Sequence, residues 1–182
     1  MGKHLRASTR SGFTIVELLI VIVVIAILAA ITIVAYTGIQ SRAYDTAVQN
    51  DLANAAKKIE LYKTNEPANR YPLASNASLL EADFSATVSA YDIDPSTTRN
   101  FIYCAHSDRS TYAILGKSKS GAAYIISSSA PAVSVYTGTW ISASPAAGIC
   151  QSVTGDSSAL FSAGYYNASS SPNGWAEWTH AN

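Results

Sequence analysis

Residues 18–36 form a run of 19 positions in which Thr32 is the only polar side chain. As an α-helix this run would be about 28 Å long, which matches the hydrocarbon thickness of a lipid bilayer. A secretory signal peptide has a shorter apolar region and is removed after it, whereas helical periodicity continues here beyond Ile33. The sequence therefore predicts a transmembrane helix that is retained in the mature protein.

Charges beside the apolar run predict its orientation. Lys3, Arg6 and Arg10 precede it, and the positive-inside rule places such a flank in the cytoplasm, with the long C-terminal part outside. The chain has 12 basic and 12 acidic residues, so a product without these three cations carries an excess of acids. Direct binding to nucleic acid is not expected, because it depends on Lys and Arg side chains that neutralise phosphates.

Glu17 is an acidic residue at the start of the apolar segment. An acidic side chain costs ~2.5–3.5 kcal/mol at the centre of a bilayer and less near the interface. One interpretation places Glu17 among the headgroups, beside the positive end of the helix dipole. The other gives it a cationic partner, which cleavage after Gly12 would create as the free α-amine of Phe13. The residues alone leave both interpretations open.

The segment SGFTIVELLIVI, residues 11–22, resembles the class III signal of type IV prepilins. The resemblance implies that a membrane-embedded prepilin peptidase cleaves between Gly12 and Phe13 and methylates the new amine of Phe13. It also implies that the Glu17 carboxylate neutralises the Phe13 amine of an adjacent subunit during assembly. A pair shared by two subunits would stabilise only the correct stagger, because any other register leaves a buried charge unpaired.

The resemblance implies a structural, non-enzymatic subunit of a type IV pilus or related filament, inserted in the inner membrane as a precursor and later exposed on the cell surface. Its expected partners are the prepilin peptidase and methyltransferase, identical or related pilin subunits, and the assembly platform with its motor proteins. An alternative is a minor pilin or pseudopilin of a type II secretion or DNA-uptake machine. A membrane-anchored extracellular binding domain is a second alternative, although a simple anchor needs neither the Gly12-Phe13 site nor Glu17.

The helix is expected to continue well beyond the apolar run. Residues 13–63 contain no Pro and only Gly38 as a glycine, so one continuous helix is predicted, although many pilins carry Pro where this chain has Val34. An amphipathic pattern follows the apolar run. Its apolar stripe contains Tyr36, Ile39, Ala43, Tyr44, Ala47, Val48, Leu52, Ala55, Ile59 and Tyr62, and its solvated side contains Arg42, Asp45, Gln49, Asn50, Lys57 and Glu60.

These signals divide the chain into four parts. Residues 1–12 are a basic leader that is removed, 13–36 are the transmembrane and filament-core helix, and 37–64 are the amphipathic helix of an exported head. Lys63 in the last turn and Pro67 beyond it indicate the end of this helix. Residues 65–182 complete the head.

The head is predicted to be α+β. Three strand-like runs, 100–105, 111–117 and 123–128, are separated by short polar turns and predict an antiparallel meander. A small sheet of this kind would cover the apolar stripe of the long helix in two layers, as the pilin resemblance also implies. A helical turn is expected near residues 78–83, and the Ser-rich and Gly-rich part from Ala130 onward is expected to be an irregular tail.

The two cysteines, Cys104 and Cys150, are predicted to form a disulfide outside the cytoplasm. The loop that they would close is long, and the chain-entropy model gives such a bridge roughly 4 kcal/mol of stabilisation. The tail contains three tryptophans, Trp140, Trp175 and Trp178. Aromatic side chains there serve either surface recognition or packing in the core, and the sequence leaves both possible.

No catalytic residue, cofactor or metal is predicted. Gly155-Asp156-Ser157 resembles part of a lipase-like block, but His180 lacks the preceding Asp that such a site requires. Cys104, His106 and Asp108 offer too few ligands at poor spacing for a metal site, and both histidines are expected at the surface. Phosphate-binding loops and internal repeats are absent from the sequence.

Overall fold

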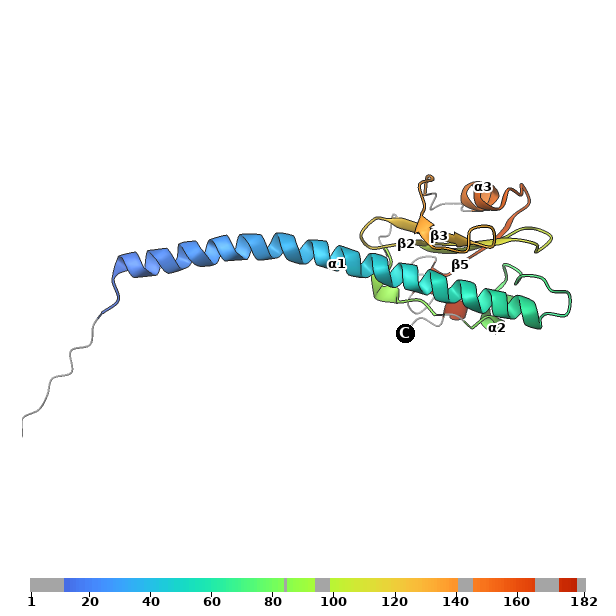
Figure 1. The fold of residues 1–182 in the computed structure, drawn as a ribbon, viewed down its shortest axis with the longest axis horizontal. Coiled ribbons are helices and arrows are strands. Elements are labelled where there is room, and N and C mark those ends of the chain that lie inside the picture. The colour runs from blue at the N-terminus through green and yellow to red at the C-terminus, as the bar shows by residue number, and fades with distance from the viewer. Residues whose placement is uncertain (1–11, 84, 94–98, 141–145, 166–173, 180–182) are drawn as a thin grey trace, which may run out of the picture. The chain divides into compact units, whose positions relative to one another are not determined.

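The computed structural model describes residues 12–83, 85–93, 99–140, 146–165 and 174–179. The chain divides into two compact units, Met1–Ile39 and Gln40–Asn182. Helix α1, Ile15–Asn65, contributes residues to both units and is helical at all 51 positions, those of Val34 and Gly38 included (Figure 1). This confirms the uninterrupted helix that the absence of Pro predicts.

The described part of the first unit is almost entirely helix, and its surface is apolar. Side chains from Phe13 to Ile39 are exposed wherever the structure describes them; Ile20, for example, is 58% exposed. The segment is long and apolar enough to cross a membrane by length and composition. Burying one such Val, Leu or Ile side chain is worth ~1.5–3 kcal/mol, so a surface of this kind is stable only against lipid or another apolar surface.

The second unit is built on one five-stranded antiparallel sheet with the strand order β4-β3-β2-β1-β5. Its strands are β1 Phe101–Ala105, β2 Tyr112–Lys117, β3 Ala123–Ser127, β4 Ser134–Val135 and β5 Leu160–Ala163. The first three confirm the predicted meander, each ending within one residue of its predicted limits. β1 and β2 pair in the register Tyr103 with Ile114, which turns both side chains toward the same face.

Residues 40–65 of α1 cover one face of the sheet (Figure 1). Val48, Leu52 and Ile59 of the predicted stripe are fully buried there. Gly116 of β2 permits this close approach, because a Cβ atom at that position would lie 2.8 Å from Cγ1 of Val48. The predicted stripe is wrong at its beginning: Tyr36, Ile39 and Ala43 are exposed, since the sheet residues of the core contact α1 only farther along the helix.

The opposite face of the sheet is covered as well. The π-helical turn η2, Ala146–Cys150, and helix α3, Gln151–Thr154, pack over it, with Ile149 in a second core that includes Leu115. The head therefore has three layers (Figure 1). The prediction of two layers followed by an irregular tail is wrong, because η2 and α3 of that tail form the third layer. The apolar run FIYCA of β1 is buried at every residue because a strand covered on both faces has no solvent side for polar residues.

Short helical elements connect the layers. Helix α2, Asn76–Glu81, lies where a helical turn was predicted, and the 3-10 turn η1, Val88–Ala90, leads into the buried Tyr91. Near the C-terminus a further 3-10 turn, η3, Glu177–Thr179, returns to the core beneath α1. The amide of Ala86 donates to the carbonyl of Thr179 at 3.1 Å, so the two connecting segments hold each other in place.

Candidate assembly site and the comparisons with known proteins

The first turn of α1 carries a reciprocal pair of hydrogen bonds between Thr14 and Glu17. Oε2 of Glu17 accepts from the backbone amide of Thr14 at 2.9 Å and from its hydroxyl at 2.8 Å. The backbone amide of Glu17 in turn donates to Oγ1 of Thr14 at 3.2 Å. This is a capping box, in which Thr at the N-cap and Glu three residues later satisfy amides that the helix leaves free.

The capping box gives Glu17 a local role that the sequence analysis missed, although the signal T-x-x-E before an apolar run is visible in the sequence. The carboxylate lies at the positive end of the helix dipole, as the first interpretation of Glu17 has it. The two hydrogen bonds that the Glu17 carboxylate accepts from Thr14 both end on Oε2, and among the described residues Oε1 accepts none. One carboxylate oxygen is therefore available to a further donor.

The predicted cleavage site lies immediately before this cap. Phe13 is 82% exposed, and a Cβ atom at Gly12 would meet no other atom of the described residues within 4 Å. Both residues lie outside the helix, in backbone that forms no regular structure. The Gly12–Phe13 bond is thus sterically open, and a new amine at Phe13 would lie one helical turn from Glu17.

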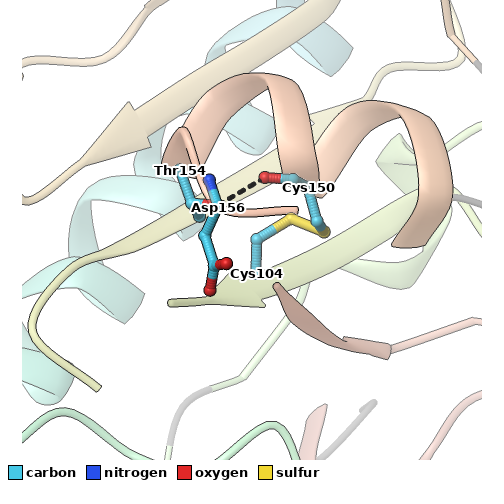
Figure 2. The surroundings of a disulfide bond; sticks show 4 residues. All are labelled: Cys104, Cys150, Thr154 and Asp156. Atoms are coloured by element: carbon cyan, nitrogen blue, oxygen red, sulfur yellow. Dashed lines mark hydrogen bonds between the residues drawn. A yellow bond between two sulfur atoms is a disulfide. The ribbon is translucent and has the colours of Figure 1, made fainter. Parts of the chain in front are cut away.

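The predicted disulfide is present. Cys104 of β1 and Cys150 at the end of η2 are bonded, with their Cα atoms 5.2 Å apart and a sequence separation of 46 (Figure 2). The Thr154 hydroxyl donates to the carbonyl of Cys150 at 2.7 Å, which fixes the start of α3 above the bridge. The disulfide fastens the third layer to β1, an inner strand of the sheet.

The three tryptophans do not form a recognition surface together. Trp178 is fully buried and Trp175 is 5% exposed, and both belong to the core beneath α1. Trp140 is half-buried against the second core, its ring 6.2 Å from that of Tyr136. The structure therefore corrects the suggestion of surface recognition for Trp175 and Trp178, because their rings are needed to fill the core.

His106, Asp108 and Asp156, which belong to the enzyme and metal motifs that the sequence analysis rejected, form ion pairs and hydrogen bonds within the head. Nδ1 of His106 lies 2.7 Å from a carboxylate oxygen of Asp108 and 3.6 Å from one of Asp156. Asp156 also accepts from the amides of Ser107 and Ser158. Throughout the described residues, no group of three or more His, Cys, Asp and Glu side chains could hold a metal ion. His180 lies outside the described residues.

One buried acidic residue escaped the sequence analysis. Asp51 of α1 is 8% exposed and accepts from the amide of Thr87 at 2.6 Å and from its hydroxyl at 3.0 Å. Burial raises the pKa of Asp51, and the two hydrogen bonds from Thr87 oppose that rise. Its position three residues after Val48 and four before Ala55 is the signal that it faces the core.

Two comparisons with known proteins found a match to this chain. The model of the prokaryotic N-terminal methylation motif matches residues 7–33. The type IV wide pilus major component PilA4 of Thermus thermophilus is 41% identical over 76 residues, which cover 42% of this chain and 56% of that protein. The match spans just over half the length of that relative, and no solved structure matches the chain. The methylation motif, the identity to a pilin and the helix-on-sheet fold together support the type IV pilin family for this chain.

Proposed function

We propose that this chain is a structural, non-enzymatic subunit of a type IV pilus or a related filament. The observation that carries the proposal is the open Gly12–Phe13 bond directly before an exposed apolar helix whose first turn holds the acid Glu17. Residues 13–36 hold the precursor in the inner membrane, with the basic leader in the cytoplasm and the head outside. Removal of residues 1–12 then releases the helix for assembly.

The apolar helix explains why such a chain polymerises. Every described side chain of residues 13–39 is exposed within its own chain, and the apolar ones would each cost ~1.5–3 kcal/mol in water. Lipid covers them in the precursor. Outside the membrane the same surface is covered by the corresponding helices of neighbouring subunits, so the helix becomes the core of the filament.

Glu17 sets the register between subunits in this proposal. Cleavage creates a cationic amine at Phe13, which the same peptidase methylates while leaving its charge. One oxygen of Glu17 serves the capping box, and the other is available to the Phe13 amine of an adjacent subunit. An unpaired carboxylate in an apolar core costs several kcal/mol, so only one stagger of the helices is stable.

The mature N-terminus tests the proposal directly. Mass spectrometry of sheared surface material should find a chain that begins at N-methylated Phe13. An intact Met1 on the exported protein would instead support a membrane-anchored binding domain and refute the filament subunit. A minor pilin or pseudopilin shares the N-terminal features, so the abundance of this chain in sheared filaments distinguishes it from a major subunit.

A further inference from the structure

The C-terminal end of α1 borders an open groove in the head. Its volume is about 410 Å³, and it lies between the last turns of α1 and the end of α2. Leu61, Tyr62 and Ala82 supply apolar surface to the groove, and the Leu61 side chain is 60% exposed. An exposed Leu beside a Tyr ring offers a surface on which another apolar group can lie.

Charges around the groove favour a cationic occupant. Glu66, Glu81 and Asp83 line it, against a single cation, Lys58. Lys58 is already engaged, because its ammonium lies 3.6 Å from the Asp83 carboxylate and also donates to the Asp83 carbonyl. Glu66 pairs with Arg109 at 3.2 Å. Glu81 is exposed and forms no ion pair within the described part of the chain.

The other end of the same helical segment presents a cation without a partner. Arg42 is exposed, and across the described ranges no carboxylate pairs with it. The nearby acid, Asp45, accepts from the Ser120 hydroxyl at 2.5 Å, and Lys119 lies over the Tyr44 ring. Arg42 is therefore the cation at this end of the head that is available to another molecule.

Arginine matches the groove in shape and chemistry. Its aliphatic stem packs well on apolar side chains such as Leu61, and its planar guanidinium stacks on aromatic rings such as Tyr62. The same guanidinium forms charge-assisted hydrogen bonds with a carboxylate, here that of Glu81. A Lys side chain would offer the charge without the planar group, so the groove suits Arg better.

We propose that this groove binds Arg42 of a second copy of the chain, which joins heads end to end. The inference rests on the proposed filament function and identifies one contact between the heads. The 19 positions from Arg42 to Leu61 correspond to about 28 Å along the helix, so contacting copies are offset by about that distance. The two contacting surfaces differ, and because contacting copies are also offset along the helix axis, this heterologous contact repeats as an open filament and does not close into a ring.

Cross-linking of assembled filaments tests the contact. The wild-type chain has no free cysteine, so Arg42→Cys and Glu81→Cys introduce the only reactive thiols. A short bismaleimide reagent should join chains that carry both substitutions into a ladder of multimers. Chains with either substitution alone should give no ladder. Filaments of the double variant that yield only monomers would overturn the proposed contact.

Charge reversal provides a second measurement. Glu81→Lys and Arg42→Glu should each lower the yield of sheared filaments about tenfold, the effect of losing one well-formed charge pair. The double reversal should restore the yield, whereas Glu177→Lys, an exposed acid outside the groove, should leave it unchanged. Equal melting temperatures of the variant heads would show that folding is intact, and a double reversal no better than the singles would reject the pairing.

These experiments separate the contact from the proposed function. If wild-type chains form filaments with methylated Phe13 but give neither the ladder nor the charge rescue, only the groove contact is wrong. If wild-type chains form no filaments and retain Met1, the proposed function itself fails.

Discussion

The substitution Glu17→Gln separates the two roles of the Glu17 carboxylate, which are to cap α1 through Thr14 and to pair with the Phe13 amine of a neighbouring subunit. Gln at this position of a capping box still accepts from the Thr14 amide, so the helix should begin where it does in the wild type. The substitution removes the charge and leaves the Phe13 amine of the neighbouring subunit without a partner. Thr14→Ala does the opposite, because it removes the hydroxyl of the cap and keeps the charge of Glu17.

The expected magnitudes differ enough to be distinguished. Loss of the capping hydroxyl costs ~1 kcal/mol, which corresponds to about a fivefold change in an equilibrium constant. Breaking a buried charge pair by removing one partner costs ~3–5 kcal/mol, or about a hundredfold or more. Glu17→Gln should therefore abolish filaments, whereas Thr14→Ala should lower their yield only about fivefold and Thr14→Ser should restore it.

The assay combines three readouts on the same cells. Membrane fractionation reports insertion, mass spectrometry of the N-terminus reports cleavage and methylation, and the sheared fraction reports assembly. Insertion and cleavage should be normal in both Glu17→Gln and Thr14→Ala. Wild-type filament yield from Glu17→Gln, together with a complete loss in Thr14→Ala, would show that Glu17 acts only as a helix cap and would refute the charge-pair reasoning.

The remaining predictions concern the stability of the head, measured by thermal or denaturant unfolding. Replacing Cys104 and Cys150 with Ser should lower the free energy of unfolding by roughly 4 kcal/mol, and a loss below about 1 kcal/mol would contradict the entropic account of this disulfide. Gly116→Ala should destabilise the head by ~1–3 kcal/mol through its clash with Val48, while Gly116→Ser should be no better. Burial raises the folded pKa of Asp51 above its usual 3.8, so its stabilising contribution is present at lower pH and is lost as the pH rises through the folded pKa. The free energy of unfolding of the wild type, measured relative to that of Asp51→Asn, should therefore fall from about pH 4 upward. A difference between the two free energies that does not change with pH would contradict the raised pKa of Asp51.

Local signals in the sequence predicted much of the fold. The absence of Pro and the apolar run predict α1 to residue 64, one residue before its end, and three β-rich runs with polar turns predict β1, β2 and β3. These elements depend on backbone preferences and on short hydrogen-bonded turns, which neighbouring residues decide. The N-terminal motif is equally local: Gly12, Phe13 and Glu17 are recognisable from their order alone, and their roles in cleavage and assembly stay predictions.

Contacts between distant residues decided the rest. Ile102 of β1 pairs with Ala163 of β5, 61 positions away in the chain, and no turn signal between them indicates that pairing. The burial of Trp178 and the inward position of Asp51 likewise depend on which segments the core brings together. The sequence by itself determined the long helix, the meander and the cysteine pair, because those follow from local preferences and composition. Only the tertiary structure decided the third layer and the surface left for a partner, because burial is a property of the packed chain rather than of any one segment.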